Sequence, residues 1–232
     1  PFSTINPTME LLILHLGSHL PARRVDAQNA LVRSGKIAIP ALQRALLRAK
    51  EDSALETWLL WTLGRIGISD RSLDSFFQKQ WEGTFNRRIQ VLRIVAFQAR
   101  ERHTNRFPSY VVSGFRDDEA RVRHALVLGL HQSKDTQWNE ELLRLIQDEE
   151  DRLVYYSAWQ AMRDLLTESQ QKELLKNAQP SVRRAALLSL LEDDSLADNE
   201  IRMMTSDSDV MTAFLAQKRL GGKVVPVIKG PA

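Results

Sequence analysis

The chain has 232 residues, of which 43% are hydrophobic and 26% charged, with a formal net charge of +3. This length is enough to bury a large core, and so small a net charge is not by itself a nucleic-acid signature. The sequence contains no cysteine, which excludes disulfides, thiolate nucleophiles and cysteine-ligated metal centres within the chain. Many Leu, Ala, Arg, Glu and Gln residues beside few Gly, Pro, Thr and Tyr residues favour helix over strand.

Charge is distributed unevenly along the chain. Residues 1–125 carry 19 Lys and Arg against 12 Asp and Glu, whereas residues 126–232 carry 13 against 17. The most apolar run, residues 11–16, is far shorter than the roughly 20 residues that a membrane helix needs, so we expect no membrane span.

The first predicted element is an N-terminal capping helix within residues 1–20. It contains His15 and His19, whose spacing of four would place both on one helix face as half of a metal site. Gly17 weakens the helix between them, and no third ligand is in register. We therefore interpret both histidines as surface or partly packed side chains, and we expect no metal or cofactor.

A repeated apolar phrase occupies the rest of the chain. Its first residue recurs at intervals of 28 to 34 residues, at Val25, Leu55, Ile89, Val122, Val154, Val182 and Val210. The residue five positions further on is apolar in all seven copies, from Ala30 to Leu215. Such recurrence is typical of solenoids, in which one helix pair cannot cover its own apolar face and must stack on its neighbours.

Each phrase is followed by a break and a second amphipathic segment, so each repeat is predicted to be a helical hairpin. The second segments are expected at 39–50, 70–80, 106–115, 136–147, 168–177 and 197–205, with a last one starting at 225. The HEAT-like repeats are thus placed at about 21–50, 52–81, 85–115, 117–147, 149–177, 179–205 and, incomplete, 208–232. Ser53 with Glu56 and Thr167 with Gln170 fit the capping-box pattern at two expected helix starts.

These patterns predict an all-α fold, a right-handed α–α superhelix of about seven hairpins spanning residues 21–232. A compact helical bundle with unequal helices is the alternative. The stretch from Val182 to Leu191 resembles the first-helix consensus of HEAT repeats, and the stretch from Asp117 to Leu126 resembles it too. The resemblance covers nearly the whole chain and implies the same solenoid.

A more particular resemblance rests on Asn6-Pro7-Thr8, residues 24–35 and residues 60–63. These strings are similar to the HEAT segment of large membrane-bound dehydrogenase/cytochrome c proteins of planctomycetes and their relatives. In those proteins it connects a β-propeller to a c-type cytochrome domain, which implies a periplasmic or cell-surface location. This chain has neither a propeller nor a Cys-x-x-Cys-His motif, so neither activity carries over, and we expect the natural protein to continue beyond residue 232.

Arginine is the main candidate for partner binding, since it supplies 23 of the 32 basic residues. Stacking would bring arginines of the first helices into a ladder that could bind an acidic partner or phosphate: Arg87, Arg88, Arg121, Arg123, Arg183 and Arg184. The favoured alternative is that they pair with Asp or Glu of the adjacent repeat, such as those within 117–119 or 148–151.

Two tryptophans complete the candidate surface. Trp58, Trp61 and Trp159 lie on apolar stripes and are expected in the core, whereas Trp81 and Trp138 lie in or beside second helices and are expected to face a partner. Acidic clusters at 193–194, 198–200 and 207–209 are interpreted as helix caps rather than calcium ligands, because none has the glycine and closing glutamate of an EF-hand loop.

No catalytic motif supports an enzyme, so the expected function is a non-catalytic scaffold or connector within a larger bacterial protein. Its partners would be another protein or flanking domains of the same polypeptide. A DNA-binding or DNA-repair protein on HEAT-like repeats is the second interpretation, motivated by the arginines of the first half. A lyase-type HEAT protein that acts on a bound cofactor is the third.

Overall fold

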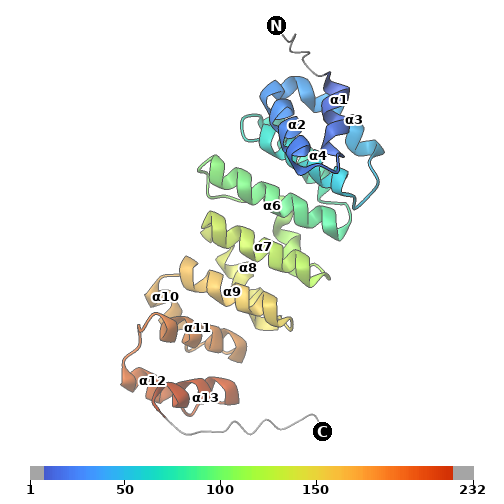
Figure 1. Cartoon of the computed structure of the whole chain (residues 1–232). Helices are drawn as coiled ribbons and strands as arrows, with labels where there is room; N and C mark the ends of the chain where they lie inside the picture. Colours follow the sequence, from blue (N-terminus) through green and yellow to red (C-terminus); the bar gives the residue numbers. More distant parts are fainter. Residues whose placement is uncertain (1–7, 222–232) are drawn as a thin grey trace, which may run out of the picture. The chain divides into compact units, whose positions relative to one another are not determined.

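The computed structural model describes residues 8–221, which form thirteen α-helices and four short 3-10 helices, with no β-strand in this range. The chain divides into two compact units, Pro1–Gly114 and Phe115–Ala232. The helices pack consecutively within each unit, which confirms the all-α, HEAT-like class (Figure 1). The right-handed superhelix stays a prediction.

Unit 1 is built on a row of first helices, α2 (Pro21–Ser34), α4 (Ala54–Ile66) and α6 (Phe85–Glu101), which pack in chain order. The N-terminal helix α1 (Met9–Leu16) packs on α2. The second helices α3 (Ile39–Arg48) and α5 (Asp74–Gln80) each follow a 3-10 turn, η1 (Gly35–Ala38) and η2 (Arg71–Leu73). Helix α3 packs on α4 and α5 packs on α6, so each second helix lies against the first helix of the next hairpin.

Unit 2 repeats this plan with the row α7 (Ala120–Ser133), α9 (Arg152–Leu165), α11 (Pro180–Glu192) and α13 (Val210–Arg219). Between them run η4 (Thr136–Trp138), α8 (Asn139–Asp148), α10 (Glu168–Leu174) and α12 (Asp198–Met204). Helix α8 contacts both α9 and α11, α10 packs on α11, and α12 packs on α13. Leu187, Ile201, Met204 and Ala216 from three of these helices form one buried cluster.

Burial of the repeated positions follows their place in the array. Ile89, Val122, Val154 and Val182 are buried, whereas Val25 and Val210, in the first and last copies, are 44% and 58% exposed. The first and last copies of the repeat thus differ from the copies between them in the burial of this position. A first helix buries its stripe only where a neighbouring helix covers it.

Two expected elements differ from the structure. The segment 106–115, expected as an α-helix, is instead the 3-10 helix η3 (Ser109–Arg116). Pro108 directly precedes it and disfavours helical backbone at Phe107, and His103 and Asn105 both adopt positive φ, so the chain turns twice before η3 begins. The capping helix is α1 alone and ends at Gly17, which leaves His19 outside it. The helix expected from 225 lies outside the described residues.

Only one of the two expected capping boxes is complete. At α10 the Thr167 hydroxyl accepts from Gln170 N–H, and the Gln170 side chain accepts from Thr167 N–H. At α4 the Ser53 hydroxyl accepts from Glu56 N–H, but the Glu56 carboxylate accepts from Asp52 N–H instead of Ser53. Glu56 is thereby free to pair with a neighbouring helix.

Helices α4 and α6 approach closely at Gly64. A Cβ added there would lie 2.7 Å from Cγ2 of Ile94, a fully buried and β-branched side chain with little freedom to move. Glycine therefore permits the contact on which the row of first helices in unit 1 depends.

We expect Gly64→Ala to lower the free energy of unfolding by about 2 kcal/mol, because the added methyl group overpacks the α4–α6 contact. Gly17→Ala is the control, since its Cβ would meet only ordinary contacts at 3.4 Å or more, and it should stay within about 0.5 kcal/mol of the parent protein. Urea unfolding followed by circular dichroism measures both. Equal stability of the two variants would contradict this account of the contact.

Candidate partner-binding surfaces

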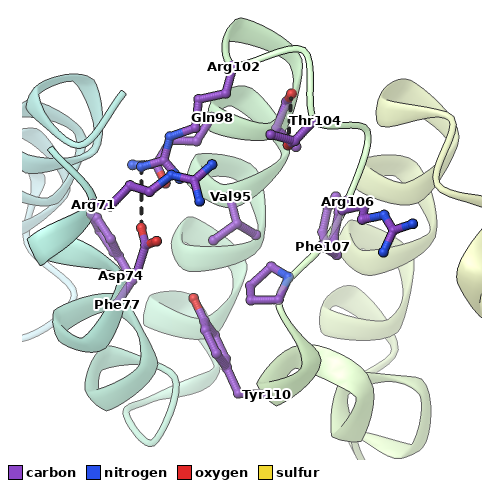
Figure 2. A pocket seen from close by; sticks show the side chains of 12 residues that line it. Arg71, Asp74, Phe77, Val95, Gln98, Arg102, Thr104, Arg106, Phe107 and Tyr110 are labelled. Carbon is purple, nitrogen blue, oxygen red and sulfur yellow. Dashed lines mark hydrogen bonds and ion pairs between the residues drawn. The ribbon is translucent and has the colours of Figure 1, made fainter. Parts of the chain in front are cut away.

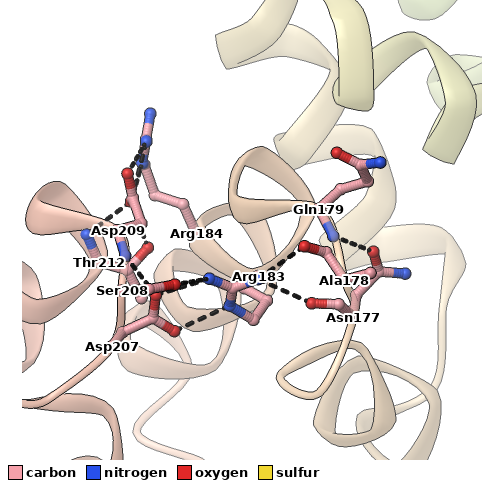
Figure 3. Close-up of polar contacts among 9 residues, drawn as sticks. All are labelled: Asn177, Ala178, Gln179, Arg183, Arg184, Asp207, Ser208, Asp209 and Thr212. Atoms are coloured by element: carbon pink, nitrogen blue, oxygen red, sulfur yellow. Dashed lines mark hydrogen bonds and ion pairs between the residues drawn. The ribbon is translucent and has the colours of Figure 1, made fainter.

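Arg183 on α11 joins three segments of unit 2 (Figure 3). Its Nε and Nη2 donate to the two carboxylate oxygens of Asp207 at 2.8 and 2.7 Å. Its Nη1 donates to the backbone carbonyls of Asn177 and Ala178 at 2.8 and 3.0 Å. Both side chains of the pair are about nine-tenths buried, so the guanidinium is largely withdrawn from any partner.

Arg184 forms a second pair beside the first. It donates from Nε and Nη2 to Asp209, whose carboxylate also accepts from Thr212 N–H at 2.9 Å and so caps α13. The hydrogen bonds from Arg183 lower the pKa of Asp207, although its burial acts in the opposite direction. Burial also tends to raise the pKa of Asp209, but the hydrogen bonds from Thr212 and Arg184 outweigh it, and the net pKa is lowered.

The same arrangement recurs at Arg123 on α7. Its Nε and Nη2 donate to the Glu149 carboxylate, both at 2.8 Å, and its Nη1 donates to Asp117 O and Asp118 O. Glu149 is almost fully buried, and hydrogen bonding to it raises the pKa of Arg123. Glu149 lies in the acidic run 148–151 that the sequence offered as an alternative to an acidic partner, whereas the contacts at 117 and 118 are to backbone carbonyls.

A fold-back contact is common to four first helices. The arginine at the fourth position of each helix donates Nη1 to one or two carbonyls of the turn before that helix; these arginines are Arg24, Arg88, Arg123 and Arg183. The carbonyls lie five or six residues earlier in the chain, so each arginine ties the entry turn to its own helix. Their recurrence is therefore explained by the construction of the repeat.

The two remaining predicted arginines differ from each other. Arg87 on α6 donates Nε to Glu56 of α4 at 2.8 Å, and Glu56 is 3% exposed. Arg121 on α7 is solvent-exposed. The structure thus does not gather the six arginines into one open ladder: four of them pair with a carboxylate of another helix or turn, as the favoured alternative supposed.

The expectation that Trp81 faces a partner is wrong. Trp81 is 9% exposed and donates its indole N–H to Ser113 Oγ at 3.0 Å, because the chain after α6 folds back over α5. Trp138 in η4 is half-buried. Trp159 is buried, as expected, but Trp61 is half-buried and donates to Gln90 on α6 at 3.0 Å.

The histidines and acidic clusters form no metal site in the part of the chain that the structure describes, where no three His, Asp or Glu side chains converge. His124 contacts Ser157 at 3.0 Å and His131 contacts Asp164 at 2.6 Å, so the two histidines bind different residues of α9. Within residues 8–221 no helix is both long and apolar enough to cross a membrane.

Helix α1 presents apolar side chains on two sides. Leu12 and Leu16 are buried within unit 1, while Leu11 and Leu14 are 40% and 71% exposed. The remaining residues of the helix include only Glu10 and His15 as polar side chains. Most of the side chains of this helix are apolar, and Leu11 and Leu14 leave an apolar part of its surface exposed.

A pocket of about 310 Å³ in unit 1 was missed at the sequence level. It lies between α5, α6 and the segment that leads into η3 (Figure 2). Arg71, Asp74, Gln98, Arg102 and Tyr110 supply polar groups to its lining. Residues of three separate segments meet here because the chain turns at 102–108. No motif in the sequence predicts this turn.

The stacked hairpins and their arginine–carboxylate pairs define the chain as an all-α protein of HEAT-like repeats. No protein-family model matches it, and no curated protein sequence matches it. A similar solved structure is the complex of CpcE and CpcF of phycocyanin lyase from Nostoc sp. PCC7120, at 18% identity over 95% of this chain and 90% of that chain, with a TM-score of 0.41. A likeness at this level bears on neither activity nor partners.

We expect Asp207→Asn to cost about 2 kcal/mol of stability near pH 7, because it breaks a nearly buried, doubly hydrogen-bonded pair. The pKa of Asp207 is lowered from its ordinary 3.8, so the contribution of the pair is fully present above about pH 4 and is lost as the pH falls further. The difference in melting temperature between the parent and the variant should therefore shrink from pH 5 to pH 2. Asp26→Asn, at an exposed position, should match the parent throughout, and a difference independent of pH would contradict the assignment.

Proposed function

We propose that the chain is a non-catalytic HEAT-like scaffold or connector that makes protein–protein or interdomain contacts within a larger bacterial protein. The observation that carries this proposal is the outward apolar face of α1, formed by Leu11 and Leu14. Single exposed leucines are common on protein surfaces, but a helix with apolar residues on both sides is not typical of a solvent-facing end.

The energetic value of covering this face supports a protein partner. Burying one leucine side chain fully contributes about 1.5–3 kcal/mol, so Leu11 and Leu14 together could supply a useful part of a specific interface. Ile37 and Leu47, in the hairpin that packs with α1, are 80% and 87% exposed and are further apolar side chains available for contact. A polar ligand such as nucleic acid gains nothing from these side chains.

The distribution of arginine argues against the DNA-binding interpretation. Phosphate binding requires guanidinium groups that can reach the backbone of a duplex, whereas Arg87, Arg123, Arg183 and Arg184 are held by carboxylates of their own chain. The excess of basic residues in the first half remains the reason to test this interpretation directly.

The contact surface can be tested by replacing Leu14 with the photo-crosslinker benzoylphenylalanine in the natural full-length protein, in cells that make it. We expect illumination to join position 14 to one defined protein or to another domain of the same polypeptide, with a yield that Leu11→Glu lowers severalfold. The same crosslinker at Gln78, an exposed polar position on α5, is the control and should not give that product. Equal yields at both positions, or none at position 14, would contradict the proposal.

The DNA-binding interpretation is tested by fluorescence anisotropy of a labelled duplex at about 50 and 200 mM salt, concentrations between which phosphate-driven binding weakens steeply. We expect no saturable binding at micromolar protein, since four of the six candidate arginines pair with carboxylates of their own chain. Micromolar binding that disappears at the higher salt concentration would favour a nucleic-acid function instead.

A further inference from the structure

The pocket in unit 1 combines an apolar wall with an excess of positive charge. Its wall is formed by side chains from α5, α6 and the segment that follows α6: Phe77, Val95, Ala99, Phe107, Pro108 and Tyr110. Three arginines, Arg71, Arg102 and Arg106, line it against one carboxylate, Asp74. Its volume of about 310 Å³ is at the lower end of the range of small-molecule sites.

The structure holds Arg102 firmly at the edge of this pocket. Its Nε donates to Ile68 O at 3.2 Å, and its Nη2 donates to Gly67 O and, at 3.3 Å, to Asp74 Oδ1. The two carbonyls belong to the turn that ends α4, so backbone groups fix the position of the guanidinium. Its Nη1 makes no hydrogen bond within residues 8–221. A positioned donor of this kind recognises an anion with little loss of side-chain entropy.

Arg71 supplies a second guanidinium at the same place. Arg71 and Arg102 both line the pocket, and in Figure 2 both side chains extend toward the same part of it, whereas Arg106 points away from them. The Arg71 side chain forms no ion pair or hydrogen bond with any other residue that the structure describes, in contrast to the side chains of Arg123 and Arg183. Two guanidinium groups and one carboxylate in the lining of one pocket leave a positive charge that an anion would neutralise.

Tyr110 provides a third donor from the opposite side. Its hydroxyl points into the pocket in Figure 2, and no residue in the described part of the chain accepts a hydrogen bond from it. Burial raises the pKa of Tyr110 above its ordinary value and Asp74 raises it further, so the hydroxyl stays protonated and able to donate at neutral pH. Its ring forms part of the apolar wall at the same time.

We propose that this pocket binds a carboxylate carried on a compact aromatic or aliphatic body. The carboxylate lies against Arg71 and Arg102 and accepts from Tyr110, and the body packs on Phe77, Phe107 and Pro108. A planar carboxylate matches the fork of a guanidinium. Inorganic phosphate would satisfy the charge but leave the apolar wall in water, so it fits the site less well. Such a carboxylate has two sources, a free small acid or the C-terminus of a peptide chain.

The test is calorimetric titration of the whole chain at low salt with phenylacetate and with phenylacetamide, which has the same body without the charge. We expect phenylacetate to bind at least about tenfold more tightly than phenylacetamide. Arg71→Gln should weaken phenylacetate binding at least about tenfold, and Tyr110→Phe, which keeps the wall and removes one donor, about threefold. Arg44→Gln, at an exposed position on α3, is the matched control and should bind like the parent.

Two further titrations distinguish the sources of the carboxylate. Tighter binding of Ala-Ala-Phe as a free acid than of phenylacetate would identify a peptide C-terminus, and the reverse order would identify a small acid; the peptide amide should not bind. The proposal is overturned if neither acid binds the parent, if Arg71→Gln binds as tightly as Arg44→Gln, or if inorganic phosphate binds as tightly as phenylacetate. The pocket shares no residue with the apolar face of α1, so these outcomes are independent of the crosslinking experiment.

Discussion

The fold depends on one constraint, that a single helical hairpin cannot bury its own apolar stripe. Each first helix therefore packs against the next first helix within its unit, as α2, α4 and α6 do in unit 1 and α7, α9, α11 and α13 do in unit 2. Second helices fill the space beside this row and contact the following first helix. The polar interactions are arranged around that stacking. Arg123 and Arg183 each bind the turn before their own helix, and the carboxylate that each one pairs with follows a later helix of the chain.

This arrangement explains why a chain rich in arginine need not be a nucleic-acid-binding protein. An arginine at the fourth position of a first helix can donate to backbone carbonyls of the preceding turn and to a carboxylate at the same time, as Arg183 does. A lysine has a single side-chain nitrogen and could not span both acceptors. Arg123 and Arg183 do both. The recurrence that suggested a ligand-binding ladder is thus better explained by local geometry repeated with each hairpin.

The sequence predicted the regular parts of the structure well, because apolar periodicity reports burial directly. Helices α4, α6, α7, α9 and α11 each contain the apolar residue expected to anchor them. The prediction from the sequence failed where a local feature determined the structure. Pro108 and two residues of positive φ give the 3-10 helix η3 in place of the expected α-helix. The segment that contains η3 also covers Trp81. Exposure of one tryptophan depends on the path of a segment some thirty residues away, which periodicity does not report.

The candidate sites arise where the repeat is irregular. In regular hairpins the polar and apolar side chains contact neighbouring hairpins, so few of them are available to bind a ligand. The third hairpin, whose second helix is lost, leaves space between α5, α6 and the segment before η3, and there Arg71 has no carboxylate partner among the residues described. At α1 the row begins with a helix that has an apolar face on both sides. A repeat protein evolves a site most readily at such breaks, since altering a residue within the regular stack would also cost the contacts that hold two hairpins together.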